Sequence, residues 1–173
     1  MITTNDERIA ENCRVIRQHG MRRRYYHDEL GFNFRMTDVQ AAIGLEQLRK
    51  LPAFNNARRS NAQYYSRSLS GVIPPCEPDG YEHVYHQYTI RVKAGKRDAL
   101  RDYLRESGIG SEVYYPVPIH QQTFYVNDLG YDESYPEAEK AALEVLSLPV
   151  HPALSSDDLE KVVSTVNKFM EMQ

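Results

Sequence analysis

The sequence predicts an α+β fold, in which a small, mainly antiparallel sheet is flanked by helices and preceded by a helical segment. Up to residue 71 the apolar residues recur at helical spacing between polar caps. Beyond residue 80 period-two strands alternate with short amphipathic helices. A run rich in proline and glycine, from Ile73 to Gly80, separates the two patterns. We therefore expect a linking helical segment over residues 1–71 and a small α/β domain over residues 72–173.

The first helix is predicted from a capping box at Thr4–Glu7, in which the threonine hydroxyl and the glutamate carboxylate satisfy free amide groups. Ile9, Cys13 and Ile16 then recur near helical spacing, and Gly20 is expected to stop the helix. The residues from Met21 to Phe34 are cationic and aromatic and show no period, which predicts an irregular loop.

A second capping box at Thr37–Gln40 opens a long helix. Ala41, Ala42, Leu45 and Leu48 form its apolar stripe. Proline lacks an N–H group, so Pro52 predicts a kink or break at Leu51. A helical pattern resumes after it and ends by Gly71.

The second region alternates strands and helices. Its expected elements are strands at 84–92 and 109–115, helices at 97–107 and from Pro136, an extended stretch at 146–150, and a last helix capped by Ser155 or Ser156.

Composition excludes several classes of protein. Lys and Arg number 21 against 24 Asp and Glu, a net charge of −3, which argues against a nucleic-acid binder. No apolar run approaches the roughly 20 residues that cross a bilayer. Cys13 and Cys76 form no CxxC pair, and no secretory segment is visible, so we expect a cytoplasmic protein without disulfides. The six histidines lack metal-ligand spacing, and no metal site is expected.

The most informative stretch runs from Gly31 to Gly44, where Asn33 and Arg35 stand among aromatics just before the capped helix. Amide and guanidinium groups donate hydrogen bonds and could bind a phosphate or a carboxylate there. The alternative is a turn in which Asn33 stabilises its own backbone.

Several segments together resemble the DegT-type aminotransferases, which act on nucleotide-linked keto sugars. They are Thr4–Asp6, Arg17–Gly20, the Gly31–Gly44 stretch, His86–Tyr88, Tyr115–His120 and Leu146–Pro152, in the family's order along the whole chain. The resemblance implies the carboxy-terminal part of a fold-type-I enzyme that uses pyridoxal 5'-phosphate (PLP), with glutamate or glutamine as amino donor.

The resemblance also implies roles for single residues. Asn33, in the turn at residues 31–37, would reach across a homodimer interface to the cofactor phosphate of the other subunit, and the helix after Asp38 would contribute to that interface. Arg35 would contact the nucleotide sugar or the amino donor. Tyr115 and His120 would line the sugar pocket. Phe32 and Phe34 stand where the family has tyrosines, which removes two hydroxyls but keeps the packing.

Two further assignments have alternatives. His120 could bind substrate or be a loop histidine held by backbone groups, and the prolines at 116 and 118 stiffen its segment. His86 and His151 are expected to be structural. The Arg22–Arg24 run could be a solvated loop or could attract a phosphorylated ligand.

Transamination needs a lysine that forms a Schiff base with the cofactor. In the family this lysine precedes the segment that matches Thr3–Asp6, and none of the six lysines of this chain lies in such a motif. We therefore expect no catalytic residue in the chain and no activity from the chain alone. The alternatives are a binding or oligomerisation module of the same fold, a fragment of a related PLP-dependent sugar dehydratase, or a nucleic-acid binder that uses the arginine loop.

Overall fold

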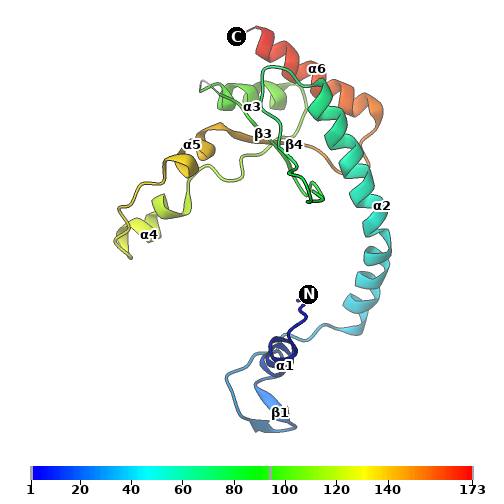
Figure 1. Cartoon of the computed structure of the whole chain (residues 1–173), viewed down its shortest axis with the longest axis vertical. Coiled ribbons are helices and arrows are strands. Elements are labelled where there is room, and N and C mark those ends of the chain that lie inside the picture. Colours follow the sequence, from blue (N-terminus) through cyan, green and yellow to red (C-terminus); the bar gives the residue numbers. More distant parts are fainter. Residues whose placement is uncertain (1, 94, 173) are drawn as a thin grey trace. The chain divides into compact units, whose positions relative to one another are not determined.

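The computed structural model describes residues 2–93 and 95–172 (Figure 1). Its elements are α1 (Glu7–Ile16), β1 (Met21–Arg23), β2 (Tyr26–His27), α2 (Asp38–Ser68), β3 (Tyr88–Arg91), α3 (Arg97–Glu106), the 3-10 turn η1 (Ile119–Gln121), α4 (Thr123–Asn127), α5 (Pro136–Glu144), β4 (Val145–Leu148) and α6 (Ser156–Glu171). Helices around small antiparallel sheets confirm the predicted α+β class. The chain divides into two compact units, Met1–Lys50 and Leu51–Gln173. The expected boundary after residue 71 stays a prediction.

Helix α1 begins differently from the prediction. Asp6, not Thr4, is the N-cap, and its carboxylate accepts hydrogen bonds from the amides of Arg8 and Ile9. Thr4 instead accepts from the amide of Asp6 through its hydroxyl. The capping box at Thr4–Glu7 was therefore wrong by two residues, because aspartate caps as well as threonine does. The helix also ends at Ile16, before Gly20.

The loop predicted from Met21 to Phe34 contains a short hairpin, since β1 pairs with β2 in antiparallel register. The guanidinium of Arg23 lies 3.5 Å from the ring centroid of its partner Tyr26. A cation stacked on a cross-strand aromatic ring stabilises such a pair. Sequence periodicity could not show this, because strands of two and three residues have no measurable period.

Two glycines hold the end of this loop against α1. Gly20 has φ +70, and a Cβ added to it would lie 1.7 Å from the carbonyl oxygen of Glu29. A Cβ on Gly31 would lie 1.9 Å from the amide nitrogen of Gly20. The two backbone segments cross more closely than any side chain permits, so both positions require glycine.

The predicted capping box of α2 is confirmed: Gln40 donates its amide to the Thr37 hydroxyl, and the Gln40 side chain accepts from the Thr37 amide. Of the kink or break predicted at Leu51, the break is wrong, because α2 continues through Pro52 to Ser68, and the kink stays a prediction. Proline removes one helical hydrogen bond, but the residues that follow are held by packing, with Ala62 and Tyr65 fully buried.

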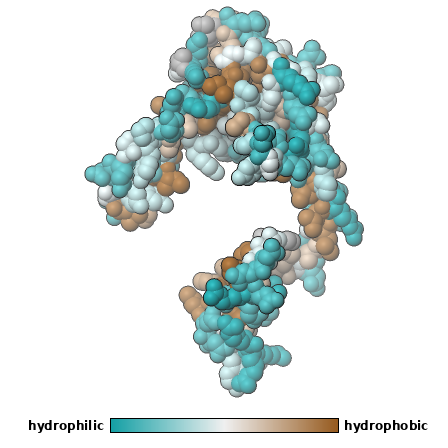
Figure 2. All heavy atoms as spheres, in the orientation of Figure 1, coloured by the Kyte–Doolittle hydropathy of each residue, from teal (hydrophilic) through white to brown (hydrophobic). Residues whose placement is uncertain are grey.

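The first half of α2 exposes apolar side chains. Val39, Ile43, Leu45 and Leu48 are each more than half exposed, and Figure 2 shows this apolar surface along the helix. Among the side chains of residues 2–50 only Val15 is buried. The first unit therefore has almost no core of its own.

The core of the second unit lies around a strand pair. β3 and β4 are antiparallel, with Tyr88 opposite Leu148, and single bridges add Ile73 beside Arg91 and Glu112 beside Ser147. The strand predicted at 84–92 is shorter, because Tyr85 has φ +44, outside the extended region. The strand predicted at 109–115 is reduced to the Glu112 bridge, since the next amide, that of Val113, bonds to the Glu112 side chain.

Helices α3 and α6 cover this core as predicted. Helix α3 contacts both α6 and β4. It buries Leu100 and Leu104, while α6 buries four apolar residues, Val162, Val163, Val166 and Phe169. A capping box between Ser155 and Asp158 begins α6, which confirms the predicted cap.

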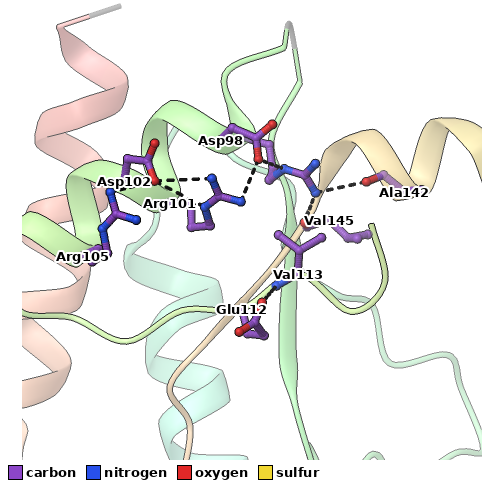
Figure 3. Close-up of polar contacts among 9 residues, drawn as sticks. Asp98, Arg101, Asp102, Arg105, Glu112, Val113, Ala142 and Val145 are labelled. Atoms are coloured by element: carbon purple, nitrogen blue, oxygen red, sulfur yellow. Dashed lines mark hydrogen bonds and ion pairs between the residues drawn. The ribbon is translucent and has the colours of Figure 1, made fainter. Parts of the chain in front are cut away.

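Helix α5 begins with Pro136 as predicted, and a buried arginine holds its end. Arg97 donates hydrogen bonds to the carbonyl oxygens of Ala142 and Val145, at 3.0 and 3.2 Å (Figure 3). Its Nε lies 2.8 Å from the Asp98 carboxylate, in a direction that makes no hydrogen bond. A cation at the free carbonyls of a helix's carboxy-terminal end also interacts favourably with the helix dipole.

No helix within the described part of the chain combines the length and apolar character needed to cross a bilayer. Cys13 and Cys76 are free thiols.

Candidate functional site

The predicted site residues lie in both compact units, Asn33 and Arg35 in the first and Tyr115 and His120 in the second.

The turn that carries Asn33 is fixed by backbone hydrogen bonds. The amide of Phe32 donates to the carbonyl of Ile16 at 2.7 Å, and the amide of Phe34 donates to that of Arg17 at 3.1 Å. The rings of Phe32 and Phe34 stack with centroids 5.1 Å apart. The Asn33 side chain is exposed, and no hydrogen-bond partner for it occurs among the described residues. Its amide therefore remains available to a ligand rather than serving the turn.

Arg35 lines a cavity of about 570 Å³ within the first unit, called here the arginine pocket. Its walls come from α1, from the hairpin and from Arg35 itself. The lining residues are Glu11, Arg14, Val15, Arg17, Gln18, Met21, Arg22, Arg23, Arg24, Tyr25 and Arg35. The Arg22–Arg24 run, for which a solvated loop was one alternative, thus forms part of a cavity wall.

Tyr115 is 73% exposed. Its ring meets only Tyr114 among the described aromatic residues, edge-on, at 5.8 Å between centroids. Neither a hydrogen bond nor an aromatic contact joins Tyr115 to His120 in the residues that the structure describes. The hydroxyl of Tyr115 is free to bind a polar ligand.

His120 is packed into a network of polar groups, with 9% of its side chain exposed. Its Nε2 lies 3.1 Å from Oε1 of Glu139. The same oxygen accepts from the Ser134 hydroxyl and from the amide of Tyr135. Three hydrogen bonds hold the pKa of Glu139 below its usual range. The one from the Ser134 hydroxyl has the largest effect, followed by those from the Tyr135 amide and from His120. The network joins η1 to the start of α5, so His120 holds its loop in place through Glu139.

A second cavity, of about 480 Å³, lies at one end of the β3–β4 pair and is called here the His86 cavity. Arg58, His86, His151 and Tyr114 are among its lining residues. Both histidines are exposed, although the sequence predicted them to be structural. Tyr114, which lines this cavity, directly precedes the loop that begins with Tyr115.

The segment around His151 is fixed by α2. Asn61 donates a side-chain hydrogen bond to the His151 carbonyl at 3.1 Å, and the Tyr65 hydroxyl donates to the Pro149 carbonyl at 2.9 Å. Sequence reasoning missed this cavity. The antiparallel pairing of the two predicted strands could have indicated it. In such a pair, a residue just before the first strand lies near a residue just after the second strand.

The lysines and possible metal ligands add no further site. None of the six lysines lines either cavity. No cluster of three or more His, Cys, Asp or Glu side chains suited to a metal ion occurs in the described ranges.

Comparison with known proteins identifies relatives along the whole chain. The model of the DegT/DnrJ/EryC1/StrS aminotransferase family matches residues 1–167. A pleiotropic regulatory protein of Geobacillus stearothermophilus is 47% identical over 98% of this chain and 46% of its own length. A UDP-N-acetyl-3-dehydro-alpha-D-glucosamine 3-aminotransferase of Acidithiobacillus ferrooxidans is 36% identical, with the same two coverages.

Solved structures agree with these matches. The crystal structure of S. venezuelae DesV in complex with a ketimine intermediate superimposes with a TM-score of 0.91 at 33% identity. The match covers 98% of this chain and 46% of DesV. The chain therefore spans about half the length of the relatives it matches.

Proposed function

Since this chain belongs to the DegT/DnrJ/EryC1/StrS aminotransferase family, we propose that it is the carboxy-terminal part of a sugar aminotransferase. The complete enzyme would transfer an amino group to a nucleotide-linked keto sugar. Glutamate or glutamine would be the donor. The observation that carries the proposal is the turn at residues 31–37, which leaves the side-chain amide of Asn33 without a partner among the described residues and carries Arg35, a lining residue of the arginine pocket. Relatives that are named as aminotransferases of UDP- or dTDP-linked sugars support the substrate class.

Enzymes of this family are PLP-dependent. When bound, PLP would supply the electron sink that transamination requires. The residues of this chain fit the phosphate end of such a cofactor, because Asn33 is an exposed hydrogen-bond donor on a rigid turn. They do not fit its aldehyde end, since none of the lysines lines a described cavity.

The Schiff-base lysine would therefore come from the part of the family's length that this chain does not span. We infer that the chain alone does not catalyse transamination. A homodimer would let Asn33 reach the cofactor phosphate of the other subunit. The exposed apolar side chains on the first half of α2 support an interface there, because a buried interface core is apolar.

In the second unit Tyr115 and His120 would shape the sugar pocket in different ways. Tyr115 would offer its exposed hydroxyl to the sugar. His120 would position the Tyr115 loop through Glu139, because its Nε2 is already engaged there.

The free thiols of Cys13 and Cys76 fit a reducing compartment, so we place the enzyme in the cytoplasm.

The cofactor assignment is tested in the complete enzyme with Asn33→Ala. We expect the dissociation constant of PLP to rise at least about tenfold, the loss of one hydrogen bond to a charged group. Asn12→Ala, an exposed asparagine on α1, is the matched control and should leave it unchanged. Equal cofactor retention in both variants would exclude the phosphate role of Asn33.

The inactivity of the chain alone has a separate test. Purified chain is mixed with PLP, a dTDP-linked 3-keto sugar and labelled glutamate, and transfer of the label is followed. We expect none above a protein-free control. Transfer that depends on a single lysine of this chain, shown by its Lys→Ala variant, would refute the missing-lysine argument.

A further inference from the structure

The arginine pocket carries an unusual concentration of one charge. Six of its lining side chains are guanidinium groups and one is a carboxylate, that of Glu11. The six are Arg14, Arg17, Arg22, Arg23, Arg24 and Arg35. The whole chain is acidic, with a net charge of −3, so this concentration is local and not a property of the composition.

Two of these arginines are neutralised by nearby acids. Arg22 pairs with Glu29 and lies 4.0 Å from Glu11, and a hydrogen bond to Glu29 raises the pKa of Arg22. Arg14 lies 3.4 Å from the Glu11 carboxylate. Both acids are thus already occupied by these two arginines.

The other four arginines, Arg17, Arg23, Arg24 and Arg35, have no carboxylate within 4.0 Å in the described part of the chain. Arg23 is stacked on Tyr26, and Arg24 lies 4.9 Å from the ring centroid of Tyr25 and donates to its hydroxyl at 3.1 Å. Aromatic rings orient a guanidinium without cancelling its charge. Four positive charges therefore line one cavity, each without a carboxylate within 4.0 Å among the residues that the structure describes.

Such an arrangement is matched by a compact ligand with several negative charges. A guanidinium group often binds a phosphate through two parallel hydrogen bonds to two of its oxygens. The cavity volume lies within the roughly 300–1,000 Å³ that small-molecule sites occupy. One carboxylate would neutralise a single arginine. A diphosphate offers enough oxygens and charge for all four.

We propose that the arginine pocket is a diphosphate-binding site, with Arg17, Arg23, Arg24 and Arg35 as the groups that hold the anion. The proposal rests on the proposed function only for the source of the diphosphate, which would be the link between nucleoside and sugar in the substrate. Free pyrophosphate shares the same chemistry. Binding itself follows from the charges and the cavity.

Calorimetric titration of the full 173-residue chain with sodium pyrophosphate tests the site. We expect one site per chain, weaker binding of inorganic phosphate, and a loss of affinity when NaCl is raised from about 50 to 200 mM. The double variant Arg17→Gln/Arg24→Gln should raise the dissociation constant at least about tenfold.

Two further variants separate a specific site from general charge and from misfolding. Arg8→Gln removes an arginine of α1 that does not line the pocket, and its affinity should equal that of the unmodified chain. Arg17→Lys/Arg24→Lys keeps the charges but loses the paired donors, so its affinity should lie between those of the unmodified chain and of the double glutamine variant. Absent pyrophosphate binding, equal losses in the Arg8 and the double glutamine variants, or tighter binding of single-stranded RNA than of pyrophosphate would each overturn the proposal.

The same titration with a dTDP-sugar, dTDP and thymidine separates the two proposals. If pyrophosphate binds in the arginine pocket but the nucleotide sugar does not, the proposed substrate class fails and the diphosphate site stands. If the nucleotide sugar binds equally well to the unmodified chain and to the double glutamine variant, the diphosphate site fails and the substrate class stands.

Discussion

Substitution of Tyr65 by phenylalanine isolates one hydrogen bond that fixes the edge of the His86 cavity. Tyr65 is fully buried, and its hydroxyl donates to the Pro149 carbonyl, two residues before His151. The variant keeps the ring and its contact with Tyr88, at 5.2 Å between centroids, but leaves the carbonyl without its donor.

An unsatisfied, partly buried carbonyl costs about 1–3 kcal/mol. We expect Tyr65→Phe to lower the free energy of unfolding of the second unit by about 1–2 kcal/mol and its Tm by roughly 3–8 °C. Tyr64→Phe is the matched control, since Tyr64 is 39% exposed and has no hydrogen-bond partner for its hydroxyl in the described residues. Its change should stay within about 0.5 kcal/mol.

The assay is urea unfolding followed by far-ultraviolet circular dichroism and tyrosine fluorescence, with unchanged slope of free energy against urea as a check. The reasoning fails if Tyr65→Phe costs no more than Tyr64→Phe. A larger loss, above about 4 kcal/mol, would also contradict it, because one hydrogen bond does not account for that much.

Three other changes have defined outcomes. Gly31→Ala should disorder the turn that carries Asn33, because its Cβ would lie 1.9 Å from the Gly20 amide nitrogen; loss of the Phe32 amide from the protected set in hydrogen exchange would show it, and native protection would refute it. Arg97→Met should cost about 2–4 kcal/mol in urea unfolding, since two carbonyls at the end of α5 lose a buried donor. Arg101→Met, at a partly exposed position with ion pairs to surface acids, should cost under about 0.5 kcal/mol, and equal costs would exclude the capping role. Burial raises the pKa of Tyr65, so the folded state holds that proton more tightly than the unfolded state. The contribution of Tyr65 to stability should be constant below pH 10, the ordinary tyrosine value, and fall as pH rises above it, so the difference in free energy of unfolding between the unmodified chain and Tyr65→Phe should shrink. A difference that stays the same from about pH 8 to 11.5 would contradict this.

Local signals in the sequence predicted local structure well. The capping boxes at Thr37–Gln40 and at Ser155–Asp158 each join groups three residues apart, so the sequence contains both partners. The same kind of signal at Thr4 was wrong because Asp6, two residues on, caps equally well. Pro52 was overestimated for a different reason, because tertiary packing of Ala62 and Tyr65 holds the helix beyond it.

The candidate site depended more on contacts between distant residues. The exposure of Asn33 follows from backbone bonds to residues 16–19, which no spacing rule shows. His120 finds Glu139 nineteen residues later, through the turn of η1 and the start of α5. His86 and His151 meet one cavity only because β3 and β4 pair in one particular register. Such pairings are set by the fold and not by neighbouring residues.

The difference in burial between the two units bears on how any unfolding curve of this chain is interpreted. A segment in which Val15 has the only buried side chain of residues 2–50 gains little hydrophobic free energy when it orders, whereas the second unit has a cluster of seventeen buried apolar residues. Residues 2–50 are thus expected to lose their structure at lower urea than the second unit. The midpoint seen at high urea belongs to residues 51–173, and substitutions in the arginine pocket should leave it where it is.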